Sequence, residues 1–111
     1  MELAAKKCIP CEAGTPPLSP DEVRKYLPEA EGWEVLEDKK IQKKFRFKNF
    51  VESMAFVNKI AQIAEEEGHH PDIHIIYSRV TIELMTHAIG GLSENDFIMA
   101  AKIDKLHRLE G

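Results

Sequence analysis

The sequence predicts an α+β fold: a four-stranded antiparallel sheet with three helices packed on one face, in the order α-β-β-α-β-β-α. Three segments place apolar residues at helical spacing behind helix-start signals, and two segments alternate β-branched or aromatic residues with polar ones around short turns. With 111 residues, 43% hydrophobic and 31% charged, the chain has the size and balance of one domain with one core.

The first helix is predicted to begin within "LSPDEVRKYL". Ser19 and Glu22 have the spacing of a capping box, and Pro20 suits the first helical position. Leu18 and Val23 can form a hydrophobic staple across this start. The beginning of the helix is therefore well specified.

A hairpin is predicted over residues 33–47, "WEVLEDKKIQKKFRF". Its polar "EDKK" stretch reads as the turn, and Ile41, Phe45 and Phe47 fall mostly on one side of the second strand. The longest helix should then run from Asn49, its cap, to about Glu67. Its expected apolar face comprises Phe50, Val51, Met54, Val57, Ile60, Ala61 and Ala64.

The second pair of strands is predicted after Pro71, with the turn near Ser78 and Arg79. Antiparallel pairing around this turn would place residues 71–73 opposite residues 84–87. The inward positions of the second of these strands are expected to be Val80, Ile82 and Leu84.

The last helix is predicted to open at "LSENDF". Ser93 and Asp96 have capping-box spacing, and Leu92 and Phe97 can form a staple. The helix is expected to continue inward with Ala100, Ile103 and Leu106.

Charge and hydropathy exclude several function classes. The net charge of -4 disfavours direct binding to nucleic acid or anionic lipid. The N-terminal residues contain no apolar run of signal-peptide length and no window approaches a membrane span, which predicts a cytoplasmic protein. Open sheet edges favour pairing with further copies, so we expect a homodimer or homotetramer.

Residues 1–17 are interpreted as a lead-in that contains a CxxC motif, Cys8 and Cys11, and residues 18–111 as the single folded domain. The motif lies in a stretch rich in Pro and Gly rather than between a strand and a helix, which argues against a thioredoxin-type redox pair. We expect a structurally minor tail, with an adventitious or intersubunit metal site as the alternative.

The stretch "EEEGHHPDIH", residues 65–74, concentrates titratable side chains. Glutamates 65–67 occupy the negative end of the long helix, where acidic side chains are unfavourable. Gly68 can stop the helix in a left-handed conformation, and Pro71 then stiffens the turn that carries His69 and His70. Local rules that fail in this way often mark a functional site.

Three interpretations compete for these histidines. A zinc site would use residues such as His69, His70, His74 and His87, but adjacent side chains in an extended segment point to opposite sides. A merely solvated or hydrogen-bonded histidine is the preferred interpretation for His74, on a strand, and for His107, on the last helix. Acid/base chemistry suits His69 and His70 better, because imidazole gives and accepts protons near neutral pH.

A second source of imidazole is expected at the same end of the sheet. His87 is expected to end the strand "VTIELMTH", and it precedes "AIGG", whose glycines allow the backbone to bend or to approach a ligand closely. A carboxylate such as Glu65 can orient one of the rings.

These residues resemble the pterin-4a-carbinolamine dehydratase family. The family pattern is an acidic or polar residue, three spacers, His-His-Pro, an aromatic residue, a His after a strand and a Leu-Ser-x-x-Asp helix start. The matching residues, within a resemblance that covers roughly residues 19–109, are Glu65, His69, His70, Pro71, Tyr77, His87 and Asp96. The match departs from many relatives at Gly68 and at Ile73.

The resemblance implies dehydration of 4a-hydroxytetrahydropterin to quinonoid dihydropterin and water, in tetrahydrobiopterin recycling, with neither metal nor other cofactor. It implies that His70 and His87 act as acid and base, that His69 binds or assists, and that Glu65 orients a ring. The implied substrate-binding residues are His69, His70, Pro71, Asp72 and His87. The alternative is a non-catalytic pterin-binding or assembly module, a partner of a hydroxylase, of the molybdopterin pathway or of a transcription factor.

Overall fold

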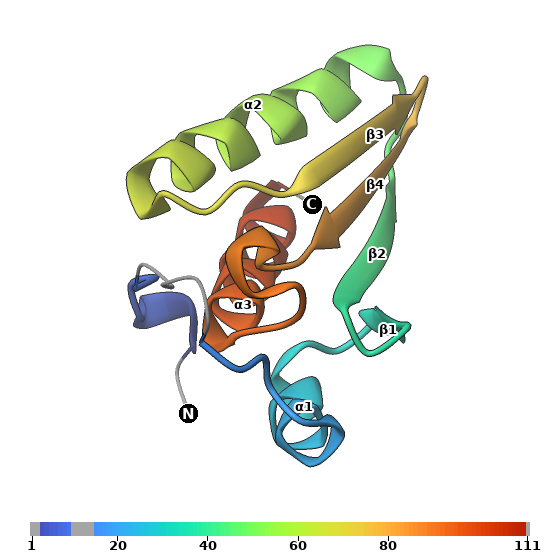
Figure 1. Ribbon diagram of the computed structural model, residues 1–111. Coiled ribbons are helices and arrows are strands. Elements are labelled where there is room, and N and C mark those ends of the chain that lie inside the picture. Colours follow the sequence, from blue (N-terminus) through green and yellow to red (C-terminus); the bar gives the residue numbers. More distant parts are fainter. Residues whose placement is uncertain (1–2, 10–14, 111) are drawn as a thin grey trace.

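The computed structural model describes residues 3–9 and 15–110, and Figure 1 shows their arrangement. The predicted α+β fold and its order of helices and strands are confirmed, with short 3₁₀ helices (η) added. The elements are η1 (Leu3–Ala5), α1 (Pro20–Tyr26), η2 (Leu27–Glu29), β1 (Glu34–Leu36), β2 (Lys40–Arg46), α2 (Phe50–Glu67), β3 (Asp72–Ile76), β4 (Arg79–Leu84), η3 (His87–Ile89) and α3 (Glu94–Glu110).

The helix starts follow the predicted capping signals. The Ser19 side chain accepts from the Glu22 N–H while the Glu22 carboxylate accepts from the Ser19 N–H, a complete capping box. The Asn49 side chain caps α2 by accepting from the Glu52 N–H at 2.9 Å. Short polar side chains therefore fix where α1 and α2 begin.

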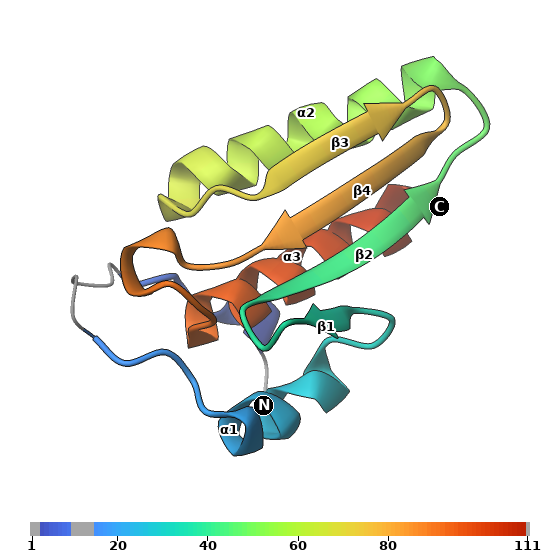
Figure 2. The ribbon, with the colours of Figure 1, turned by 45° about the vertical axis from the view of Figure 1, so that its right-hand side comes forward.

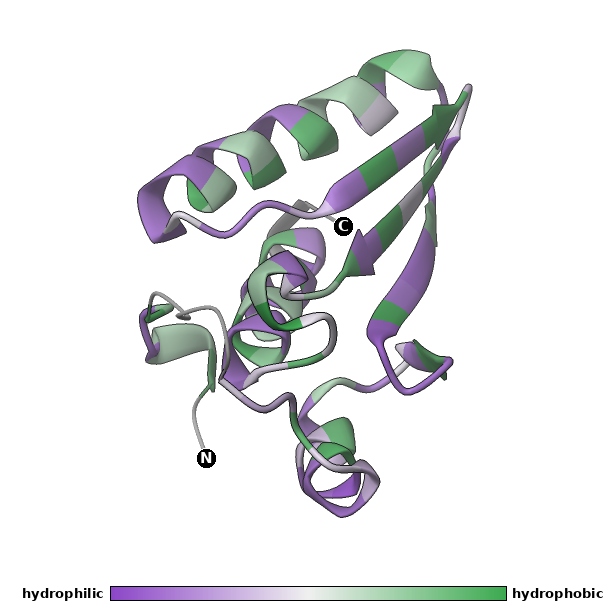
Figure 3. Ribbon diagram, in the orientation of Figure 1, coloured by the Kyte–Doolittle hydropathy of each residue, from purple (hydrophilic) through white to green (hydrophobic). Residues whose placement is uncertain are grey.

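The four strands form one antiparallel sheet in the order β1-β2-β4-β3. Hydrophobic and hydrophilic residues alternate along these strands in Figure 3, and the inward side chains of β4 are fully buried. The β3–β4 register pairs Asp72 with Glu83 and Ile73 with Ile82. The turn thus falls at Tyr77 and Ser78, one residue earlier than expected. The end of α2 and the end of β4 still lie at the same end of the sheet.

The buried face of α2 differs from the predicted one. Its buried residues are Ser53, Phe56, Ile60 and Ala64, whereas Phe50 is 49% and Val51 75% exposed. The helix carries apolar residues on two stripes, and the stripe with the large Phe56 packs against the sheet and α3. Apolar spacing alone could not decide between the two stripes.

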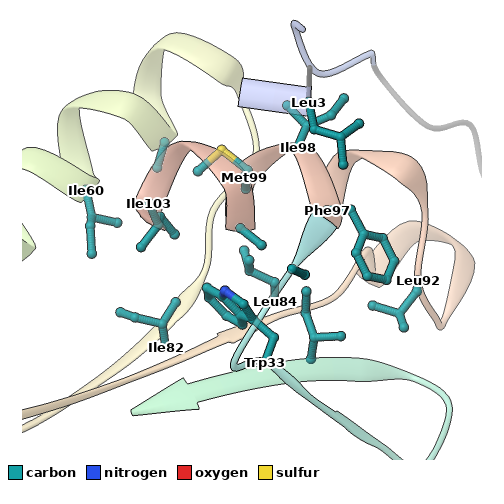
Figure 4. Packing of buried hydrophobic residues seen from close by; sticks show 14 of the residues in the cluster. Leu3, Trp33, Ile60, Ile82, Leu84, Leu92, Phe97, Ile98, Met99 and Ile103 are labelled. Carbon is teal, nitrogen blue, oxygen red and sulfur yellow. The ribbon is translucent and has the colours of Figure 1, made fainter. Parts of the chain in front are cut away.

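Figure 2 shows α2 and α3 side by side against one face of the sheet, with α1 near β1. Between these layers lies the core, in which Figure 4 shows Ile82 and Leu84 of β4 facing Ile60 of α2 and Ile103 of α3. All four side chains are fully buried. This packing sets the position of α2 relative to the start of α3, and the candidate site lies where they meet.

Residues 3–9 are part of the packed structure, so the expectation of a minor tail is wrong for them. Leu3 is 1% exposed and belongs to the core cluster. The Lys102 ammonium of α3 donates to the Ala4 carbonyl oxygen at 2.8 Å. We call residues 3–9 the N-terminal strap; Cys11 lies outside the described residues.

Among the helices of the described residues, none combines the length and the apolar character needed to cross a membrane.

Candidate functional site

A glycine turn ends α2 and directs the two adjacent histidines toward the rest of the site. Gly68 adopts the left-handed conformation, with φ 66° and ψ 26°, and its N–H bonds to the Ala64 carbonyl. The His69 N–H also donates to the Ala64 oxygen, at 3.2 Å. The helix therefore stops sharply, as the sequence predicts, and His69 follows directly.

His69 points inward and is held by a buried carboxylate. Its Nε2 lies 2.7 Å from Asp96 Oδ1; the His69 side chain is 12% exposed and that of Asp96 0%. The other carboxylate oxygen accepts from Thr86 Oγ1 and from the Ser93 N–H, both at 2.9 Å. One carboxylate thus joins the end of α2, the segment after β4 and the start of α3.

His70 has a different carboxylate partner. Its Nε2 lies 2.5 Å from Oε2 of Glu65, and both side chains are largely exposed. The two adjacent histidines thus pair with carboxylates from different helices. Glu65 is thus in contact with one of the two rings, and its orienting role stays a prediction.

His87 carries the third imidazole and lies in a loop that follows β4. Thr86 and Gly91 form an isolated bridge, in which the Thr86 N–H donates to the Gly91 oxygen at 2.8 Å. His87 lies in the 3₁₀ turn within this loop and not at the end of a strand, because β4 ends at Leu84. Gly90, with φ 66°, closes the turn by bonding to the His87 carbonyl.

A pocket of about 410 Å³ lies between these segments, a volume in the usual range for small-ligand sites. The three predicted histidines that line it come from the end of α2 and from the loop after β4. Of the other predicted site residues, Glu65, Pro71 and Asp72 are not among its lining residues. The pocket is lined by Cys8, Ile9, Glu67, Gly68, His69, His70, Met85, Thr86, His87, Ala88 and Asn95.

Asp96 has more contacts in the site than its sequence pattern predicts, and one of them is with Thr86, which the sequence does not single out. Asp96 was interpreted as a helix-capping residue, and it does accept from the Ser93 N–H. The same carboxylate also holds His69, a contact that depends on how α2 and α3 pack. The clues in the sequence were the capping-box spacing of Ser93 and Asp96 and the Leu-Ser-x-x-Asp match that includes Asp96.

The unfavourable glutamates at the end of α2 have specific partners. Glu65 pairs with His70, as described above. Glu67 accepts from the Cys8 N–H at 2.7 Å and lies 3.8 Å from the Lys102 ammonium. Contacts with His70, Cys8 and Lys102, rather than a favourable interaction with the helix dipole, thus account for the positions of two of the three carboxylates.

The thiol of Cys8 lies in the wall of the pocket and is partly buried. Burial, reinforced by the negative charge of Glu67, raises the pKa of the Cys8 thiol to about 12. The thiol is therefore protonated near neutral pH and is neither a nucleophile nor a ready metal ligand there.

Within the described part of the chain, no three His, Cys, Asp or Glu side chains come together as a metal site requires. His107 packs against the rings of Phe45, Phe47 and Phe56, a core role. His74 lies exposed on β3 and outside the pocket lining.

An α+β domain with three imidazoles around one small pocket, two of them paired with carboxylates, has the groups that acid/base chemistry on a small ligand requires. The chain belongs to the pterin 4 alpha carbinolamine dehydratase family, whose model matches residues 16–106.

Relatives similar over nearly the whole chain support this membership. A protein of Alkaliphilus metalliredigens, provisionally named pterin-4-alpha-carbinolamine dehydratase, is 53% identical over 93% of this chain and 94% of its own length. A protein of Nitrosospira multiformis with the same provisional name is 52% identical over 97% of this chain and 95% of its own.

Solved structures show the same fold. The crystal structure of a transcriptional coactivator/pterin dehydratase from Brucella melitensis has a TM-score of 0.77 and 32% identity, covering 81% of this chain and 97% of that one. A pterin dehydratase-like protein identified as a RuBisCO assembly factor in the alpha-carboxysome has a TM-score of 0.60 and 26% identity, covering 70% and 92%.

Proposed function

We propose that this protein dehydrates 4a-hydroxytetrahydropterin to quinonoid dihydropterin and water. The observation that carries the proposal is the single pocket lined by His69, His70 and His87, which come from two segments of the chain. The proposal extends the family membership to a specific reaction and to specific residues.

The reaction needs two proton transfers at neighbouring atoms. A base removes the proton from N5, the electron pair forms the N5=C4a double bond, the C4a–O bond breaks, and an acid protonates the leaving hydroxyl as water. His70 and His87 are proposed as the acid and base. Imidazoles suit both tasks because each can hold or release a proton near neutral pH.

Two carboxylates support the imidazoles in different ways. Asp96 accepts a hydrogen bond from His69 Nε2, which directs the Nδ1 side of that ring away from the carboxylate and fits a binding or assisting role. Glu65 restrains the more exposed His70. In this proposal neither carboxylate transfers a proton to the substrate.

The test is the rate at which freshly generated 4a-hydroxytetrahydropterin is converted, followed by the absorbance of quinonoid dihydropterin. His70→Ala and His87→Ala should each lower kcat/KM by about 10²-fold. His74→Ala is the matched control, because this exposed histidine lies outside the pocket lining. Rates equal to the wild type in both pocket variants would contradict the assignment.

The wider role that we propose is recycling of tetrahydrobiopterin in the cytoplasm by a homo-oligomer. Pterin is its proposed small-molecule partner, and the acidic net charge of -4 argues against direct nucleic-acid binding.

The second candidate function is a non-catalytic binding or assembly module. It is favoured by the names of the two solved relatives, one a transcriptional coactivator/pterin dehydratase and the other a RuBisCO assembly factor. This alternative predicts that the purified protein binds a reduced pterin, or a protein partner, and does not accelerate the dehydration. The same assay therefore separates the two functions.

A further inference from the structure

The N-terminal strap, residues 3–9, is fixed to both helices that border the pocket. The Cys8 N–H donates to Glu67 near the end of α2 at 2.7 Å. Asn95, near the start of α3, forms a two-way pair with Ile9: its Oδ1 accepts from the Ile9 N–H at 2.9 Å, and its Nδ2 donates to the Ile9 carbonyl at 2.5 Å. The strap thus has a defined position beside the pocket.

The partners that hold the strap are largely buried, so its position does not depend on surface ion pairs alone. Asn95 is 7% exposed, and Leu3 at the other end of the strap is 1% exposed in the core. Lys6 adds an ion pair to Glu94, 2.7 Å between Nζ and Oε2. Ile9, which lines the pocket, keeps 67% of its surface exposed.

The strap brings contact surface to the pocket but no group that transfers protons near neutral pH. Ile9 is aliphatic, and the high pKa of the Cys8 thiol, about 12, keeps it protonated. The imidazoles come from other segments. A wall of this composition acts on substrate binding and not on the chemical step.

We propose that the strap determines which pterin side chain the pocket accepts, with Ile9 and Cys8 contacting the saturated C6–C7 part of the ring and its C6 substituent. This inference rests on the proposed function. The pyrimidine edge of a pterin is rich in donors and acceptors and needs polar partners, whereas the saturated part and the carbon chain of its substituent can contact an aliphatic wall. The substituent is unchanged in the dehydration, so contact with it contributes to affinity.

The test compares two stable probes by isothermal titration calorimetry: 7,8-dihydrobiopterin, with a three-carbon side chain at C6, and 6-methyl-7,8-dihydropterin. Ile9→Ala should weaken binding of the first by about tenfold and of the second by only about threefold, because less apolar contact is lost. In the dehydration assay the variant should raise KM and leave kcat within about twofold.

Val51→Ala is the matched control. Val51 is 75% exposed, comparable to Ile9, and lies at the start of α2, outside the pocket lining. This variant should bind both probes as the wild type does. Equal thermal midpoints for Ile9→Ala and the wild type would show that the fold is intact, as the exposure of the side chain predicts.

The inference and the proposed function fail in different ways. Unchanged dissociation constants in Ile9→Ala, or a wild type that binds neither probe, would overturn the role of the strap, even where turnover is normal. A wild type that binds both probes but has no turnover would overturn the dehydratase proposal, and the selective weakening in Ile9→Ala would still support the strap.

Discussion

At the scale of single residues, Asp96 connects the fold to the site. Its two oxygens divide their partners: one faces His69 and the other accepts from Thr86 and from the Ser93 N–H. A carboxylate can only accept in this arrangement, so the hydrogen of the shared bond belongs to His69 Nε2. The position of that hydrogen determines whether Nδ1, on the other side of the ring, donates or accepts a hydrogen bond.

Asp96→Asn tests this role. The amide oxygen would stay with the Ser93 N–H, which needs an acceptor, and the amide NH₂ would then face Nε2 and move the imidazole hydrogen to Nδ1. We expect kcat for 4a-hydroxytetrahydropterin to fall by about 10²-fold.

Asp104→Asn provides the control on the same helix. Asp104 is 8% exposed and accepts from Trp33 Nε1 and from Lys43 Nζ, away from the pocket. This variant should cost about 1–2 kcal/mol of the free energy of unfolding and leave kcat unchanged. Equal kcat for Asp96→Asn and the wild type would show that Asp96 is only a helix cap.

At the scale of elements, capping and alternation could be predicted, and the choice of a helix face could not. Ser19 and Asn49 specify helix starts through contacts within four residues, and Val80 and Ile82 are assigned by alternation along one strand. Phe56 is buried because of what packs against α2, which no local pattern contains.

The pairing of β2 with β4 includes a carboxylate whose charge matters for stability. Glu83 accepts from Gln42 Nε2 at 2.6 Å and from Lys40 Nζ at 3.2 Å. Burial alone would raise the pKa of Glu83, but these hydrogen bonds outweigh it and lower the pKa from its ordinary 4.5. The stabilisation is therefore complete above pH 4.5 and is lost as the pH falls through the lower pKa of the folded state.

Glu83→Gln should accordingly lower the thermal midpoint at pH 7 by about 4 °C, for a loss of about 1 kcal/mol. The difference from the wild type should shrink at a second pH well below 4.5, where the wild type loses the same charge. Differential scanning calorimetry at both pH values measures it, with the exposed Glu34→Gln on β1 as the control. An equal difference at both pH values would contradict this origin.

At the scale of the whole molecule, the sheet ends in two strands, β1 and β3, that each have one neighbour among the described strands. Exposed apolar side chains lie beside one of these edges, at Ile76 and Tyr77. Both features suit association with further copies.

We therefore expect sedimentation equilibrium to give a mass of two or four times 12.6 kDa at micromolar concentration. A mass of 12.6 kDa across the whole concentration range would contradict the predicted homo-oligomer.

The candidate site could be predicted in part at this scale. His69, His70 and His87 were found because they lie in two short stretches with unusual glycine and proline neighbours. The strap was missed because Cys8 and Ile9 reach the pocket through Asn95 and Glu67, contacts that join residues far apart in the chain. Local composition carries no signal for such contacts.

The three-part origin of the pocket has a consequence during synthesis. Ile9 leaves the ribosome early, His69 in the middle and Asp96 only with α3, so a nascent chain lacking α3 has no buried partner for His69. The proposed activity should thus arise abruptly, once the last helix has emerged and docked, and not grow with chain length.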